Sequence, residues 1–246
     1  MLTKSLSAAV VCAFALSSSV LLAAAPKEIL APVEKVFIAA GYDDNDNIQI
    51  SLYGNFTDTC YRVGPTGFTV DHGNHKIKVW AKAYDYSSRE TGGVCLDILT
   101  PFLLNVSIGV LPEGQYKIEV NAQTATADLD VAKSTSDSPD DYLYAPVTQS
   151  KIEAVSGQSS LKATISGTFP RLYKGCMVMK TVRSYRTPQN ILVVLPISEM
   201  ELDETICKNT KLNFEASIPF SPFEDTALLH VRVANGLSQT QLIDSH

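Results

Sequence analysis

The most specific local feature is a run of five consecutive oxygen-bearing side chains. The run is Asp43-Asp44-Asn45-Asp46-Asn47, and it stands between two segments that we expect to be strands. Calcium takes six to eight oxygen ligands from carboxylates, amides and carbonyls, so the run is a candidate calcium site. The sequence favours the other interpretation, a turn rich in Asp and Asn whose side chains bond their own backbone and stay solvated.

The histidines are the next residues whose type could do chemistry. His72 and His75 share a short polar segment, His72-Gly73-Asn74-His75, but two imidazoles alone make a weak metal site, so we expect an exposed turn. His230 alternates with Leu229 and Val231, and we expect it to face solvent on a strand.

Known catalytic motifs are missing from the sequence. A nucleophilic hydrolase needs a Ser or Cys beside a His that a carboxylate orients. The chain contains no Gly-x-Ser-x-Gly, no His-Glu-x-x-His and no Gly-rich phosphate loop. The sequence therefore favours a protein that is not an enzyme and assigns no catalytic residue.

A locally basic and aromatic segment in the second half could bind a partner. It consists of Lys174, Lys180, Arg183, Tyr185 and Arg186. Exposed clusters of Arg and Tyr are common in protein interfaces, and the alternative is a solvated sheet face.

The N-terminal 25 residues are typical of a secretory signal peptide. Lys4 precedes an apolar and Ser-rich stretch, and Ala23-Ala24-Ala25 supplies the small residues of a cleavage site. We therefore expect residues 1–25 to be removed and the mature protein to be secreted or periplasmic. No later segment is apolar enough to predict a membrane span.

The net charge of the chain argues against one class of partner, nucleic acid. The chain carries 20 Lys and Arg against 26 Asp and Glu, a formal net charge of −6. Nucleic acid requires a basic face, so the acidic balance disfavours nucleic acid as a partner.

Landmarks in the first half recur in order in the second half. Ala31-Pro32-Val33 recurs 114 positions later as Ala145-Pro146-Val147, and Gly54-Asn55-Phe56 recurs 113 positions later as Gly167-Thr168-Phe169. The pattern predicts two copies of one domain, at residues 27–133 and 145–246. The polar segment between them, residues 134–144, is the predicted linker.

The cysteines of the expected mature chain are Cys60, Cys95, Cys176 and Cys207. An even number in an exported chain indicates disulfides, and four cysteines allow three pairings. Each predicted copy holds one early and one late cysteine, so we predict the pairs Cys60–Cys95 and Cys176–Cys207.

Apolar and polar residues alternate with a period of two along much of the chain. Ile48, Ile50 and Leu52 form one such set, and Ile77, Val79 and Ala81 form another. Period-two alternation is typical of half-buried strands. Many short strands in about 100 residues per copy predict an all-β protein of two tandem antiparallel β-sandwich domains, each with one disulfide.

The segment Leu111-Pro112-Glu113-Gly114-Gln115-Tyr116-Lys117-Ile118-Glu119-Val120 resembles the E–F corner and F strand of fibronectin type III and other immunoglobulin-like domains. The resemblance implies an immunoglobulin-like sandwich in which the Tyr116 hydroxyl bonds back to the backbone of the corner. Cys60 lies only 35 positions before Cys95, with Trp80 midway, so the bridge is not expected to be the usual inter-sheet disulfide.

The run Asp43–Asn47 is also similar to the calcium-binding string of cadherins. Cadherins place that string at a domain junction, followed by a Pro-containing strand start. Here Ile48-Gln49-Ile50 follows it, and the run falls inside the first predicted copy.

These observations predict an exported, non-enzymatic module that recognises an unknown protein or glycan at the cell envelope or outside the cell. One alternative is a structural spacer or assembly component of the envelope. The other is a secreted hydrolase or an inhibitor of a hydrolase.

Overall fold

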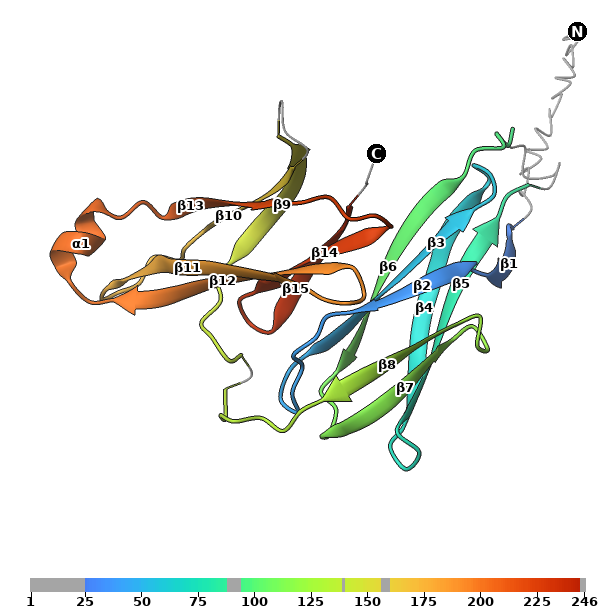
Figure 1. Cartoon of the computed structure of the whole chain (residues 1–246), viewed down its shortest axis with the longest axis horizontal. Coiled ribbons are helices and arrows are strands. Elements are labelled where there is room, and N and C mark those ends of the chain that lie inside the picture. The colour runs from blue at the N-terminus through green and yellow to red at the C-terminus, as the bar shows by residue number, and fades with distance from the viewer. Residues whose placement is uncertain (1–24, 88–93, 139, 156–159, 244–246) are drawn as a thin grey trace, which may run out of the picture.

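The computed structural model describes residues 25–87, 94–138, 140–155 and 160–243, and the predicted signal peptide lies outside them except for residue 25. The described chain is almost entirely β-structure, with one helix of six residues (Figure 1). The predicted all-β fold is confirmed.

The described part of the first half contains eight strands. They are β1 (Lys27–Leu30), β2 (Val33–Ile38), β3 (Ile48–Phe56), β4 (Tyr61–Asp71), β5 (Lys76–Asp85), β6 (Thr100–Gly109), β7 (Gly114–Val120) and β8 (Ala125–Val131). β2, β3 and β6 form a three-stranded sheet in that order. The second sheet has the order β1-β5-β7-β8, with β4 on the other side of β5.

The second half contains seven strands and the helix. They are β9 (Val147–Ala154), β10 (Leu161–Thr168), β11 (Cys176–Arg186), β12 (Ile191–Glu201), α1 (Glu204–Asn209), β13 (Asn213–Phe220), β14 (Ala227–Val233) and β15 (Leu237–Ile243). β13-β10-β9 form one sheet and β11-β12-β14-β15 form the other.

Most neighbouring strands in the described residues run antiparallel. The two exceptions are β5 with β7 and β12 with β14, which run parallel. Side-chain alternation is the same in parallel and antiparallel strands, so the sequence pattern does not reveal these pairs.

Alternation along the strands builds the core as the sequence predicts. Ile48, Ile50 and Leu52 in β3 are fully buried, as are Ile77 and Ala81 in β5. Lys78 and Trp80, which alternate with the buried residues of β5, point the other way because successive residues of a strand face opposite sides of its sheet.

A close backbone approach fixes where β3 meets the start of β2. A Cβ on Gly54 would lie 2.0 Å from the Pro32 carbonyl oxygen and 2.7 Å from Cζ of Phe102. The Phe102 ring stacks on Phe56 at 4.6 Å between centroids. Gly167 has the same surroundings in the second half, 2.2 Å from the Pro146 carbonyl oxygen and 2.6 Å from Cζ of Phe214.

The structure contains the Tyr116 hydroxyl contact and the disulfide pairs that the sequence predicts. The Tyr116 hydroxyl donates to the Pro112 carbonyl oxygen at 3.1 Å, which is the contact that the corner motif implies. The disulfides Cys60–Cys95 and Cys176–Cys207 are both present and confirm the predicted pairing.

The two halves pack face to face. The inward positions of β14 belong to the second core, and the alternate positions turn toward the first half. Leu228, Ile191 and Val193 thus join the hydrophobic cluster of the first half. Figure 1 shows β14 and β15 beside β3 and β6, with α1 at the end of the second half that points away from the first.

Polar contacts complete this interface. Ser238 Oγ donates to Gln49 Oε1 at 2.7 Å, and Thr240 Oγ1 donates to Asn105 Oδ1 at 2.8 Å. The outer face of β3 is therefore partly covered, whereas Asn105 and Ser107 on β6 stay exposed.

We predict that Gly54→Ala destabilises the protein by about 3 kcal/mol, because the new methyl group overlaps a backbone oxygen that cannot move without shifting a strand. Urea unfolding followed by circular dichroism measures the change. Gly73→Ala is the matched control, since its nearest neighbour is an Asp71 oxygen at 3.6 Å, and its effect should stay within about 0.5 kcal/mol. Equal effects at the two positions would contradict the close approach at Gly54.

Candidate functional site

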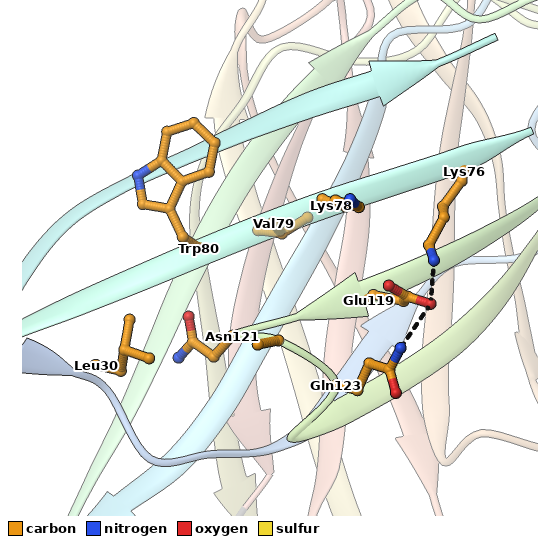
Figure 2. Close-up of a pocket in the computed structure, with 9 residues that line it drawn as sticks. Leu30, Lys76, Lys78, Val79, Trp80, Glu119, Asn121 and Gln123 are labelled. Carbon is orange, nitrogen blue, oxygen red and sulfur yellow. Dashed lines mark hydrogen bonds and ion pairs between the residues drawn. The ribbon is translucent and has the colours of Figure 1, made fainter.

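A pocket of about 510 Å³ opens on the outer face of the five-stranded sheet of the first half. Its volume falls within the range of small-ligand sites. Figure 2 shows Trp80 and Leu30 at one end and the Lys76–Glu119–Gln123 group at the other. The complete lining is Leu30, Lys76, Lys78, Val79, Trp80, Glu119, Asn121, Ala122 and Gln123.

Trp80 stands on the solvent side of β5 because its neighbours Val79 and Ala81 take the core positions. Its indole ring lies over Gly67, the partner residue on β4; a Cβ there would be 2.1 Å from Trp80 Cζ2. Trp80 remains 38% exposed. Gly67 therefore leaves room for the ring to lie on the sheet, while part of the ring stays accessible.

Charged and amide groups line the far end of the pocket. Lys76 Nζ lies 2.6 Å from Glu119 Oε1, and Gln123 Nε2 donates to the same oxygen at 3.4 Å. The hydrogen bond from Lys76 lowers the pKa of Glu119, so this carboxyl group is ionised at neutral pH. Lys78 pairs in register with Glu119 across β5 and β7 and also lines the pocket.

Asn121 lines the pocket at the point where the strand beside β5 changes from β7 to β1. β7 pairs with β5 up to Val79, and β1 pairs with it from Lys82. The buried Asn121 side chain accepts from Ala81 N at 2.9 Å and donates to Ala31 O at 2.7 Å. It thus supplies the hydrogen bonds that a continuous strand would make at that gap.

The turn beside the pocket has unusual backbone geometry. Asn121, Ala122 and Gln123 have φ of 45°, 59° and 82°. The left-handed region costs a residue with a Cβ roughly 1–2 kcal/mol, and such strain clusters at binding and active sites. The turn holds Gln123 where its side-chain amide reaches Glu119.

This arrangement suits reversible binding of a ligand with an apolar face and several polar groups. An accessible aromatic ring offers contact area, and the carboxylate, amide and ammonium groups offer hydrogen bonds in fixed directions. A second pocket of about 470 Å³ lies between β2 and β8, but its aromatic residue, Tyr42, is buried.

The run Asp43–Asn47 lies at the junction of the two halves. Asp43 Oδ1 accepts from Asn45 N at 3.2 Å, and Asp44 Oδ1 accepts from Ser134 N at 2.8 Å. Asn45 Nδ2 donates to Ser136 O at 2.8 Å. These side chains bond the turn itself and the predicted linker, and calcium binding by the run stays a prediction.

Asp46 makes the most buried ion pair of the described chain. Its Oδ2 lies 3.2 Å from Arg232 Nη2, and the two side chains are 9% and 7% exposed. The Arg232 guanidinium also lies 4.5 Å from the centroid of the Tyr42 ring. Burial raises the pKa of Asp46, and the charge of Arg232 opposes the rise. The pair therefore links β14 to the loop before β3, and a cation already contacts this carboxylate.

All five residues of the predicted partner-binding patch are exposed, and four of them also make contacts within the molecule. Tyr185 donates to Ala40 O at 3.2 Å, and Arg183 Nη1 donates to the Tyr142 hydroxyl at 3.3 Å. Arg186 lies 4.0 Å over the Phe223 ring. Lys180 pairs with Glu199 at 2.6 Å. Lys174 lies in the loop before β11, and partner binding by the five residues stays a prediction.

The expectation that His230 faces solvent is wrong. His230 is 2% exposed because the first half covers its side of β14, and its Nε2 has no hydrogen-bond partner among the described residues. Burial, with a further contribution from Arg232, lowers the pKa of His230 to about 3. His72 is exposed in the turn before β5, as expected, while the neighbouring His75 ring lies against Tyr116 at 4.9 Å.

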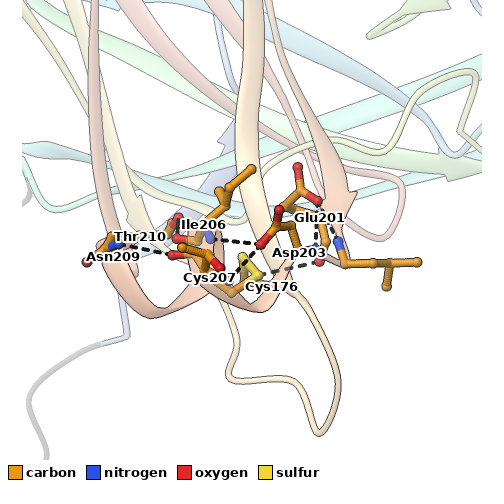
Figure 3. The surroundings of a disulfide bond; sticks show 9 residues. Cys176, Glu201, Asp203, Ile206, Cys207, Asn209 and Thr210 are labelled. Carbon is orange, nitrogen blue, oxygen red and sulfur yellow. Dashed lines mark hydrogen bonds between the residues drawn. A yellow bond between two sulfur atoms is a disulfide. The ribbon is translucent and has the colours of Figure 1, made fainter.

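The end of the second half that carries α1 is tied by Cys176–Cys207 (Figure 3). Asp203 caps the helix by accepting from Thr205 N at 2.7 Å and Ile206 N at 3.3 Å. Among the described residues, the one group of potential metal ligands within 4.8 Å of each other is Asp58, Cys60 and Cys95. Its two cysteines form the other disulfide, so their thiolates are not free to bind an ion.

Trp80 is the main site residue that sequence reasoning missed. It is the only Trp of the chain and alternates with Lys76, Lys78 and Lys82 on the solvent side of β5. A lone aromatic residue on the polar side of an alternating strand was the available signal.

Comparison with known proteins supports the sandwich without naming an activity. Residues 50–130 match the family described as the ORF11 beta-sandwich domain. The match runs from β3 to β8 and includes Trp80 and most of the pocket lining. No curated protein and no solved structure matches the chain. In the described part of the chain, no helix has the length and apolar character needed to cross a membrane.

We predict that Arg232→Met and Asp46→Asn each lower the free energy of unfolding by about 3–5 kcal/mol, because removing one partner leaves the other polar group buried without its ion pair. The double variant should lose less than the sum of the two. Urea unfolding of the four proteins measures the coupling. Lys180→Met breaks the exposed pair with Glu199 and should cost no more than about 1 kcal/mol. Additive effects at Asp46 and Arg232 would contradict the pair.

We predict that His230 makes stability fall as the pH falls from about 6.5 toward 3. The unfolded chain protonates this imidazole near pH 6.5 while the folded chain keeps it neutral to about pH 3, so unfolding takes up a proton in that window. The loss attributable to His230 is up to about 1.4 kcal/mol per pH unit. Urea unfolding at pH 7, 6 and 5 should give a flatter profile for His230→Leu than for wild type, with exposed His72→Gln as the control. Parallel profiles for wild type and His230→Leu would show that the imidazole is accessible.

Proposed function

We propose that this chain is an exported, non-enzymatic binding protein that recognises a glycan through the pocket beside Trp80. The observation that carries the proposal is an accessible indole ring next to ordered carboxylate, amide and ammonium groups. The C–H face of a sugar ring packs on an aromatic ring while its hydroxyl groups exchange hydrogen bonds with such side chains. A protein ligand is the alternative that the same pocket allows.

Export rests on two observations. Two disulfides fit a protein of an oxidising compartment, and the N-terminal residues have the pattern of a signal peptide. We therefore place the mature protein in the periplasm or outside the cell.

We further propose that the two halves are copies of one immunoglobulin-like unit. The support is the shared sheet order, the parallel pairs β5/β7 and β12/β14, and the matching surroundings of Gly54 and Gly167. The Tyr116 hydroxyl contact supports the immunoglobulin-like type. The parallel pairs depart from it, because that fold uses antiparallel sheets.

A structural component of the envelope is the second candidate. It is favoured by the buried Asp46–Arg232 pair, which makes the two halves a stiff unit, and by exposed aliphatic side chains next to Cys95. Val94 and Leu99 are 86% and 68% exposed. A spacer of this kind would assemble with further copies of the chain, which analytical ultracentrifugation of wild type and Leu99→Ser would reveal. No contact among the described residues favours the hydrolase alternative.

The test of glycan binding uses Trp80 itself. Because the chain has one Trp, its fluorescence reports on this pocket alone. Titrating the folded protein with a panel of envelope and plant oligosaccharides should change the intensity or wavelength of emission for at least one of them. Calorimetry with that glycan should show at least about tenfold weaker binding for Trp80→Ala. The lost contact between the sugar ring and the indole should be of the same order as base–aromatic stacking, which is worth roughly 1–3 kcal/mol.

Tyr173→Ala is the matched control for this experiment. Tyr173 is 99% exposed and lies in the second half, away from the pocket, so its loss should leave the affinity unchanged. Equal weakening by both substitutions, or no response to any glycan, would contradict the proposed function.

A further inference from the structure

The charge of the Trp80 pocket is opposite to that of the molecule. The chain as a whole has six more acidic than basic side chains. The ionisable groups that line the pocket are Lys76, Lys78 and Glu119, which give two positive charges against one negative. Lys76 is paired with Glu119, so Lys78 is the lining cation without an ion pair among the described residues; the charge of Asp71 on β4 acts on it only at longer range.

Lys78 is placed to reach a ligand that lies on Trp80. Both residues are on the solvent side of β5, two positions apart, so their side chains point to the same side of the sheet. Lys78 is exposed, and no ion pair of the described chain involves it. Across the strand, it faces Thr69 on β4 and Glu119 on β7.

We propose that the glycan recognised at this pocket is anionic and carries a uronic-acid carboxylate that binds the ammonium group of Lys78. This inference rests on the proposed function and names the ligand class for the same site. The sugar ring packs on Trp80, the amide group of Gln123 borders its hydroxyl groups, and Lys78 supplies the charge that a neutral sugar would not use. Glu119, held by Lys76, disfavours a second carboxylate at the far end of the pocket.

The glycan is preferred over an acidic peptide because the pocket sets one unpaired cation beside an accessible aromatic ring. The C–H face of a uronic-acid ring packs on Trp80 while its carboxylate reaches Lys78. Asp and Glu side chains supply a carboxylate but have no ring face for the indole.

The test titrates the mature protein with tetragalacturonate, with its fully methyl-esterified form, and with a tetra-aspartate peptide, following Trp80 fluorescence. We expect the acid to bind at least fivefold more tightly than the ester, and the preference to shrink at 0.5 M NaCl because salt screens the charge. Lys78→Gln should lose about fivefold in affinity for the acid and nothing for the ester, the size of one accessible ion pair. Lys35→Gln, an exposed lysine on β2, should change neither.

Each other outcome has a distinct meaning. Equal binding of acid and ester overturns the anionic ligand while the proposed function stands. Binding of the peptide alone overturns the glycan in favour of an acidic protein partner. A response to neutral oligosaccharides and none to the acid also overturns the inference. No response to any sugar contradicts the inference and the proposed function together. Thermal melts of both lysine variants should match wild type, so a change in affinity is not a folding effect.

Discussion

The arrangement of this protein depends on burying the outer face of one sheet of each half against the other. Arg232 and Asp46 lie at the centre of that contact, where each compensates the charge of the other in a site nearly closed to water. A buried ion pair contributes little net stability, but it is very unfavourable to separate. It therefore fixes the relative position of the halves more than it strengthens them. The polar contacts of Gln49 and Asn105 follow the same interface.

This packing decides which surface remains free for a ligand. The outer faces of β3 and of β12 with β14 contribute to the junction, and Tyr185 of β11 reaches it through a hydrogen bond to Ala40. The outer face of β5 with β7 faces solvent and carries Trp80. The gap between β1 and β7, closed by Asn121, gives that face its pocket.

Much of the architecture was predictable because the buried residues of a half-buried strand recur at every second position. Ile48, Ile50 and Leu52 were recognisable as core residues, and the order of cysteines within the repeated landmarks led to the disulfides that are observed. The corner contact of Tyr116 followed from a local motif. These features depend on residues close in sequence, or on a pattern that each strand carries by itself.

The remaining features depend on contacts between distant strands. His230 looked solvated because alternation reports one face of a sheet and cannot reveal that another sheet covers the second face. The same limit applies to Tyr185, which stays partly exposed while its hydroxyl donates to the Ala40 carbonyl oxygen of the first half. The alternation of apolar and polar residues did not predict the parallel pairs β5/β7 and β12/β14. Predicting that Trp80 lies on the sheet surface beside a pocket required knowing that Gly67 lies beneath its ring on a neighbouring strand.

We propose the open face of β5 around Trp80 as the ligand-binding surface. It is tested by a ¹H–¹⁵N NMR spectrum of the labelled protein with and without tetragalacturonate, because the single indole N–H gives one resonance that belongs to Trp80. Ligand binding at this surface should shift that resonance together with the backbone amides of Lys78, Asn121 and Gln123, while the amides near Cys207 stay in place. Shifts confined to the second half, or an unmoved indole resonance under saturating ligand, would contradict it.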